Sequence, residues 1–309
     1  MMKGPFDMRK YVIAALALAV LAPGTSAQAE PRPPDAADSA WQLSVDAGLA
    51  ATQAAYSDNW TGGEAGSFNW TFTSNSMAAK KLTSVLHSTT TLKLAFGQTY
   101  TQLLLDDGSS QWQRPRKSTD LIDLESVLRF DLHKFVDPYM AVRVETQFLD
   151  ASVRQLKRYF SPAKITESGG FIRVFADDPK KLQLKSRFGF ALRQIATKTI
   201  IDTTAETTEW NTTKDGGLES VTDLKAALNE TLSYTSKLTL YKALFFSESD
   251  TAPTDDWKTA DMNWEHILSA TVAKYIQVNL YFQLMYDKQI DAGVRVKETL
   301  GMGLTYKLF

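Results

Sequence analysis

Apolar and polar residues alternate over most of the chain after the first forty positions. In residues 182–196, for example, Phe188 and Phe190 fall on one face of an extended backbone, whereas Arg187 and Arg193 fall on the other. Successive side chains of a β-strand point to opposite faces, so a period of two predicts strands with one apolar and one polar face.

The alternation predicts an all-β protein with about twelve strands, and ten or fourteen strands are the neighbouring alternatives. The expected strands cover residues 41–57, 67–80, 85–102, 118–132, 138–154, 165–176, 182–197, 218–233, 237–249, 259–272, 275–288 and 294–309. Strands of soluble proteins usually have about five or six residues. Most of these segments instead reach the roughly ten residues that a tilted strand needs to cross a bilayer.

The expected connections also alternate in length. Short ones cover residues 81–84, 133–136, 177–181, 234–236 and 273–274, whereas long ones, such as 58–66, 103–117 and 200–217, follow the odd-numbered strands. Short turns on one side and long loops on the other are typical of an up-and-down antiparallel barrel in the bacterial outer membrane. A large soluble all-β domain is the alternative, but it has no reason to keep this asymmetry.

The first residues have the features of an export signal. Lys3, Arg9 and Lys10 precede an apolar run at residues 11–21, and Ala27-Gln28-Ala29 fits a cleavage site. We therefore expect a signal peptide at residues 1–29, a flexible leader at 30–40 and a barrel at 41–309. The apolar run is too short for a membrane anchor, and no later stretch approaches the roughly 18 apolar residues of a membrane helix. An exported chain of this kind can span a membrane only as a closed barrel.

Composition excludes several kinds of chemistry. The 34 basic and 35 acidic residues nearly cancel, so charge gives no reason to expect nucleic acid as a partner. There is no cysteine, which excludes disulfides and thiolate metal sites. We expect no metal and no cofactor, because only three histidines occur and none has a neighbour at metal-binding spacing. His87 and Ser88 are adjacent in a strand and point to opposite faces, so they cannot act as a base and nucleophile pair. The chain is not expected to be an enzyme.

The polar faces of the middle strands carry many charges, which we expect to line the lumen: Asp123, Glu125, Arg129, Asp131, Arg143, Glu145, Arg173, Lys185, Arg187 and Arg193. The acidic residues of the fourth strand and the basic residues of the seventh are expected to lie too far apart for most direct pairs. Two interpretations remain open. The charges either pair and fill the lumen, or they form acidic and basic walls of a solute pathway.

The last strand has the features of an assembly signal. Leu300, Met302, Leu304, Tyr306 and Leu308 alternate with polar or small residues, and the chain stops at Phe309. This ending resembles the terminal strand by which the barrel-assembly machinery recognises its substrates, although the apolar set is one residue out of register with the final aromatic residue.

A loop motif gives a family resemblance. Asn59-Trp60-Thr61-Gly62-Gly63 is followed by Ser67-Phe68-Asn69-Trp70, by Leu94-Ala95-Phe96-Gly97-Gln98-Thr99, by Arg116-Lys117-Ser118-Thr119-Asp120 and by Val144-Glu145-Thr146-Gln147-Phe148. In this order they resemble an uncharacterised family of bacterial outer-membrane barrels with an Asn-Trp-x-x-Gly-Gly signature. The resemblance implies a fold and a location but no activity. Asn59, Trp60, Gly62 and Gly63 are most simply explained as a tight loop with an interfacial tryptophan, and a ligand-binding loop is the alternative.

The sequence therefore predicts a barrel in contact with outer-membrane lipids. Its expected function is passage or binding of a small polar solute through the lumen. The alternative is a non-conducting structural or surface-interaction barrel whose lumen is closed by charged side chains, and an outer-membrane enzyme ranks third.

Overall fold

The computed structural model describes residues 40–56, 64–105, 109–153, 156–202 and 207–307. The expected signal peptide, residues 30–39 of the leader, the loop residues Asn59, Trp60, Gly62 and Gly63, and the terminal Phe309 lie outside the described residues.

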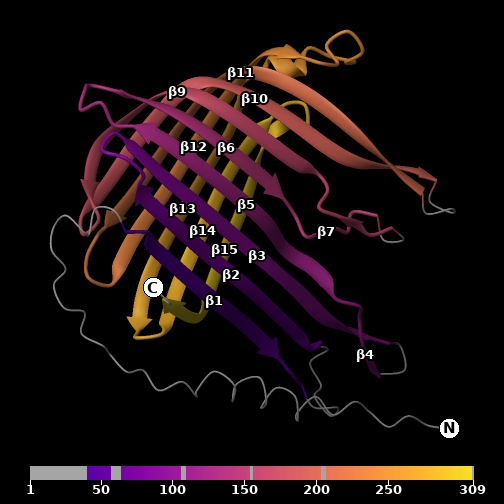
Figure 1. Ribbon diagram of the computed structural model, residues 1–309. Coiled ribbons are helices and arrows are strands. Elements are labelled where there is room, and N and C mark those ends of the chain that lie inside the picture. The colour runs from indigo at the N-terminus through magenta and orange to yellow at the C-terminus, as the bar shows by residue number, and fades with distance from the viewer. Residues whose placement is uncertain (1–39, 57–63, 106–108, 154–155, 203–206, 308–309) are drawn as a thin grey trace. The chain divides into compact units, whose positions relative to one another are not determined.

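Twelve antiparallel strands close into a barrel (Figure 1). They are β1 (Gln42–Ala54), β2 (Ser67–Lys81), β3 (Leu86–Leu104), β5 (Arg116–Phe130), β6 (Asp137–Thr146), β9 (Ala163–Asp178), β10 (Leu182–Asp202), β11 (Thr207–Ala227), β12 (Leu232–Phe246), β13 (Asp261–Ala273), β14 (Ile276–Asp287) and β15 (Asp291–Lys307). Each strand pairs with its neighbours in chain order, and β1 pairs with β15 to complete the circle. The short β4 (Ser110–Trp112) pairs with the end of β3, and β7 (Leu149–Asp150) pairs with β8 (Arg158–Tyr159) outside the main sheet.

The turns on one side of the barrel are short, as predicted. They cover residues 82–85, 131–136, 179–181, 228–231 and 274–275. Polar side chains close two of them: Thr83 Oγ1 accepts a hydrogen bond from the Leu86 amide, and Asn229 Oδ1 accepts one from the Leu232 amide. On the other side, the β12–β13 loop contains a 3₁₀ turn, η1 (Asp256–Lys258), whereas the β14–β15 connection is only residues 288–290.

Three expected boundaries were wrong. The turn predicted at 234–236 lies inside β12, and much of the loop predicted at 200–217 belongs to β10 and β11, which form one long hairpin. The strand predicted at 138–154 ends at Thr146. The carboxylate of Asp120 accepts hydrogen bonds from the amides of Phe148 and Leu149, at 2.7 and 2.9 Å, which holds that part of the chain away from the ladder.

The outer face of the barrel is apolar. Large side chains such as Met140, Phe171, Phe188, Leu300 and Met302 are exposed there, and their strand neighbours point inward. Lipid is the medium in which such a wall is stable, since the hydrogen-bonded ladders of the closed sheet pair the backbone groups of neighbouring strands. The chain is a β-barrel of the bacterial outer membrane. Within the described residues, no helical segment has the length and apolarity of a membrane span.

Candidate functional site

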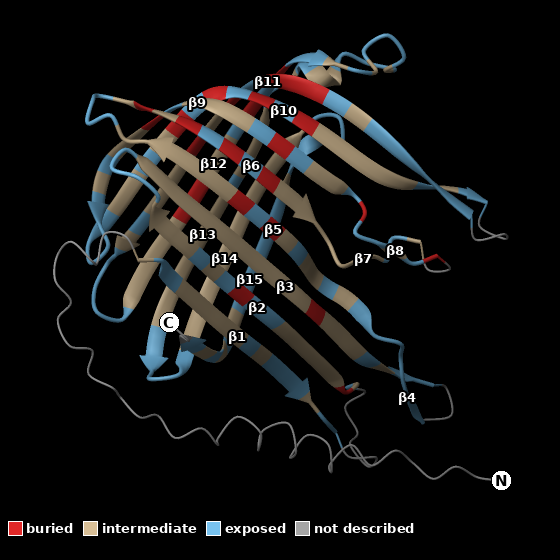
Figure 2. Ribbon diagram, in the orientation of Figure 1, coloured by how far each residue is buried: buried red, intermediate tan, exposed pale blue. Residues whose placement is uncertain are grey.

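The inner face differs between the two halves of the barrel. Buried positions gather on β5, β6, β9, β10, β11 and β12, whereas β1, β2, β3, β14 and β15 carry few of them (Figure 2). Many of the buried positions are charged, and burial of a charge is stable only where it is paired and hydrogen-bonded. The contacts of these charges therefore decide how much of the lumen is filled.

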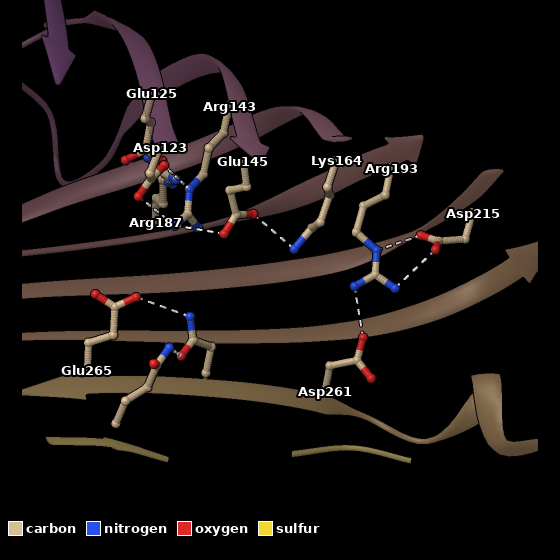
Figure 3. Close-up of polar contacts among 12 residues, drawn as sticks. Asp123, Glu125, Arg143, Glu145, Lys164, Arg187, Arg193, Asp215, Asp261 and Glu265 are labelled. Atoms are coloured by element: carbon tan, nitrogen blue, oxygen red, sulfur yellow. Dashed lines mark hydrogen bonds and ion pairs between the residues drawn. The ribbon is translucent and has the colours of Figure 1, made fainter. Parts of the chain in front are cut away.

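Glu125 on β5 is the centre of one group of charges. Its carboxylate contacts the guanidinium of Arg187 on β10 and lies 2.8 Å from the ammonium of Lys237 on β12. Beside it, Arg143 on β6 forms a bidentate pair with Asp123, at 2.8 and 2.9 Å, and a contact of 3.1 Å with Glu145. Lys164 on β9 lies 3.0 Å from the other oxygen of Glu145. Asp123, Arg143, Glu145 and Lys164 thus form a chain of alternating charge (Figure 3). The group of Glu125, Arg187 and Lys237 lies beside it.

Arg193 on β10 is the centre of a second group, nearer the long-loop side. It donates to both carboxylate oxygens of Asp215 on β11, at 2.7 and 3.0 Å, and to Asp261 on β13 at 2.8 Å (Figure 3). Its guanidinium lies 3.5 Å from the ring centroid of Tyr241, whose hydroxyl donates to Asp215 at 2.5 Å. The guanidinium is thus satisfied on its edges by carboxylates and on its face by an aromatic ring.

Several of these contacts cross the lumen. Glu125 and Arg187 belong to strands three places apart in the sheet, and Lys237 comes from a strand two places further on. Lys93 on β3 lies 3.6 Å from Glu265 on β13, which is also a cross-lumen contact. The two charged strands were expected to lie too far apart for most direct pairs, and the contact between Glu125 and Arg187 is an exception to that expectation. The long side chains of glutamate and arginine span the distance between the backbones of strands that are not neighbours.

The remaining expected lumen charges lie near the short turns. Arg129 contacts Asp131 at 3.1 Å and Asp137 at 3.9 Å, and Asp131 lies in the turn after β5 rather than on the strand. Lys185 points inward but is 45% exposed, with Asp223 3.9 Å away. The prediction that Arg173 lines the lumen was wrong. It lies on the outward phase of β9, and its guanidinium is 3.6 Å from the exposed ring of Phe135, because the inward phase of that strand is carried by Thr166, Ser168, Gly170 and Ile172.

Sequence reasoning missed four members of these charged groups: Lys164, Asp215, Lys237 and Asp261. Asp215 falls in the loop predicted at 200–217, and Lys237 is the first residue of the strand predicted at 237–249. Asp261 begins β13, two residues after the predicted start of that strand. The alternation of β11 and β12, continued through residues 215 and 237, indicates that both side chains point inward. Asp215 lies directly opposite Arg193 on the neighbouring strand, whereas the partners of Lys237 and Asp261 come from strands that are not neighbours and have no local signal.

The wall formed by β14, β15, β1 and β2 is open instead of packed. Its inward residues near the middle of β15, β1 and β2 are small and mostly uncharged, and Thr73, Asn75 and Thr299 are exposed although they point into the barrel. A Cβ added at Gly301 would meet no atom within 4 Å. The lumen is therefore filled on one side and open on the other.

A cavity of about 450 Å³ lies at the long-loop end of the lumen. The second charged group forms part of its wall through Arg193, Asp261 and Tyr241, and Gln289 and Arg295 line it from the side of β14 and β15. Ile195, Met262, Met285 and Ile290 also line it, so its wall offers apolar surface beside the charged side chains. Among the described residues, no group of three histidines or carboxylates is placed to hold a metal ion.

Several solved structures resemble this chain, and one family model matches part of its sequence. A search of curated proteins found no match. Solved structures similar to this chain include an outer-membrane channel from Pseudomonas putida F1 (12% identity, 90% of this chain and 99% of that chain, TM-score 0.39). They also include the translocator domain of the autotransporter NalP from Neisseria meningitidis (10% identity, 97% and 95%, TM-score 0.34) and a FadL homologue from Pseudomonas aeruginosa (14% identity, 87% and 78%, TM-score 0.35). Residues 51–151 match the model of a family described as "Protein of unknown function (DUF3078)".

Proposed function

We propose that this barrel is a narrow channel for small polar solutes. The channel follows the wall of β14, β15, β1 and β2, beside the ion-paired network that occupies the rest of the lumen. The observation that carries the proposal is that Thr73, Asn75 and Thr299 point inward and remain exposed, while the inward residues of the facing strands are buried. Hydroxyl and amide groups along such a wall can replace part of the hydration of a passing solute without binding it tightly.

Lys93 and Glu265 border this passage. Their side chains are 32% and 16% exposed and lie 3.6 Å apart, so they are less buried than the pairs around Glu125 and Arg193. A partly hydrated pair of opposite charge gives the passage a transverse field, which favours polar solutes over apolar ones. The expected solute is therefore small, polar and without a large net charge.

Single-channel recording in a planar bilayer tests the proposal directly. The folded protein is expected to give small, steady conductance steps. Gly301→Trp is expected to reduce them, because its side chain enters the open part of the lumen, whereas Leu300→Trp faces lipid and should leave them unchanged. Absence of steps from the folded protein would refute the channel.

One observation favours the alternative, a barrel without conduction. Contacts from Glu125 to Lys237 and from Lys93 to Glu265 cross the lumen, so a modest shift of side chains on the open wall would close it. A silent wild-type barrel in which Lys93→Ala together with Glu265→Ala produces conductance would establish that alternative.

A further inference from the structure

Glu219 on β11 is an inward acid without a basic partner. Asp215 and Asp223, four residues before and after it on the same face, each lie opposite a basic residue of β10 and within ion-pair distance of it. The residue opposite Glu219 on β10 is Gly189, which has no side chain. The row of ion pairs between these two strands therefore lacks its basic member at Glu219.

The carboxylate of Glu219 is enclosed. The residue is 6% exposed, and its Oε2 is buried without a hydrogen-bond partner. Tyr241, opposite it on β12, donates its hydroxyl to Asp215. Arg187, an inward base of β10, contacts Glu125. Burial of a carboxylate without a compensating donor is costly, so a ligand with an ammonium group would stabilise Glu219.

Arg295 on β15 is a base without an acidic partner. The residue opposite it on β14 is Met285, which is uncharged. The Nε of Arg295 is buried without a hydrogen-bond partner, and no carboxylate of the described residues is in ion-pair contact with its guanidinium. Asp261 lies in the wall of the same cavity but contacts Arg193. Arg295 thus lacks an anion, as Glu219 lacks a cation.

Both residues line the cavity of about 450 Å³ at the long-loop end of the lumen. Their strands are four places apart in the sheet, so the two charges belong to different sides of the wall. The other basic residues of this wall all contact carboxylates: Arg143, Lys164 and Arg193. A ligand that carries one positive and one negative group would complete both unpaired charges at once.

Apolar side chains of the same wall indicate what the rest of the ligand is. Ile195, Met285 and Ile290 line the cavity, and Met285 is the neighbour of Arg295 in the ladder. Burial of aliphatic groups against such surface favours binding. The volume lies within the range of sites for small molecules.

We propose that this cavity binds a small aliphatic zwitterion, either an amino acid or a short peptide with apolar side chains. Its ammonium contacts Glu219, its carboxylate contacts Arg295, and its side chain packs against Ile195 and Met285. Charge-assisted hydrogen bonds at both ends fix its orientation. This goes beyond the channel, because it assigns a ligand and a binding site that do not depend on conduction.

Calorimetric titration of the full processed protein, folded in detergent, tests the charges of the ligand. The probes are leucine and leucyl-leucine, and the tighter of the two distinguishes an amino acid from a peptide. N-acetylation or amidation of that probe should weaken binding about tenfold or more, because each removes one charge-assisted contact. Glycine and glycylglycine, which lack the aliphatic groups, should also bind more weakly. Absence of binding by both probes, or equal affinity for an N-acetylated or amidated form, would overturn the proposal.

Substitutions test which residue contacts which end. Glu219→Gln should remove the preference for a free over an acetylated amine and keep the preference for a free carboxylate over an amide. Arg295→Gln should do the reverse. Asp223→Asn and Lys297→Gln are the controls, because these residues share the strands and the inward face but do not line the cavity, and both preferences should remain.

Retention of both preferences by Glu219→Gln or by Arg295→Gln would contradict the assignment. Gel migration of unheated and heated samples shows whether each variant is folded. If a variant does not fold, the blocked probes on the wild-type protein decide the matter.

These outcomes are independent of the channel test. A conducting barrel that binds neither probe refutes the zwitterion site alone. A silent barrel that binds a probe with the expected preferences refutes the channel alone.

Discussion

Single side chains of the interior are held by several partners at once. Arg193 contacts two carboxylates and an aromatic ring, and Glu125 accepts from a guanidinium and an ammonium. Removal of one partner from such a group leaves a buried charge without compensation, which costs far more than the pair itself contributes. The stability lost when a charged residue is replaced should therefore depend on how deeply that residue is buried, and not on its charge alone.

Arg193→Met tests this dependence. It leaves Asp215 buried with no cation beside it, so we expect the barrel to lose about 3–5 kcal/mol of stability. The measurement is unfolding by urea in lipid vesicles. Lys185→Gln is the control, because that exposed pair should contribute about 0–1 kcal/mol. Equal midpoints for the two variants would show that the Arg193 group has no structural role.

Gly189→Ala tests a close approach between β9 and β10. An added Cβ would lie 2.2 Å from the carbonyl oxygen of Gly169, so the strands must separate to admit it. We expect a loss of about 1–3 kcal/mol, as for other overpacked interiors. Gly301→Ala, which enters open space, should be nearly neutral in the same unfolding assay. The alternation in the sequence places Gly189 on the inward face, where an added methyl group would be expected to fit. An unchanged free energy of unfolding for Gly189→Ala would therefore contradict the close approach of β9 and β10.

At the scale of the strand, alternation decides which side chains meet lipid. Leu280 and Asn279 are adjacent on β14 and point to opposite faces, outward and inward. Leu280→Arg is expected to cost about 2–4 kcal/mol if it lies near the membrane midplane, whereas Asn279→Arg places its charge in the lumen. The fraction of folded protein is measured from the difference in gel migration between unheated and heated samples. Similar folded fractions would show that the faces are wrongly assigned.

The β12–β13 loop is tied to the β14–β15 turn by one ion pair. Hydrogen bonds from Lys288, at 2.7 Å, and from Thr254, at 2.6 Å, lower the pKa of Asp256 below its ordinary value. A lowered pKa means that the tie stabilises the loop above the usual aspartate pKa of about 4 and is lost as the pH falls through the lower folded value.

Hydrogen exchange measures this tie. Amides of residues 256–259, corrected for the intrinsic effect of pH on exchange, should be protected at neutral pH and lose protection in acid. Asp256→Asn should lack the protection at every pH, and Asp250→Asn, elsewhere in the same loop, should behave like the wild type. Protection in the Asp256→Asn variant would mean that the loop is ordered by other contacts, such as the packing of Trp257 against Tyr241.

At the scale of the molecule, the closed wall accounts for the location of the protein. The sheet returns on itself through β1 and β15, and its exposed exterior is rich in large apolar side chains. Closure satisfies the backbone in lipid, while the charged network is kept away from hydrocarbon.

Export can be tested on the whole chain. We expect the mature protein to begin near Glu30 and to sediment with outer membranes, as measured by mass spectrometry of the intact protein and by density-gradient fractionation. A form in which Ala27 and Ala29 are both replaced by bulky residues should accumulate uncleaved. Recovery of mature protein from soluble periplasmic extract would contradict the barrel in its membrane.

The sequence by itself determined the strands, their number and, for most of them, the face that meets lipid. Alternation is a local property, because each side chain is selected for lipid or lumen independently of its distant partners. The tertiary structure decided which charges meet. Glu125 and Lys237 are 112 positions apart, and only the stagger of the closed barrel brings them within 2.8 Å. It also placed Arg173 on the outer face and limited the pairing of β1 with β15 to five residues each, since the register between the first and last strands has no signal in either strand alone.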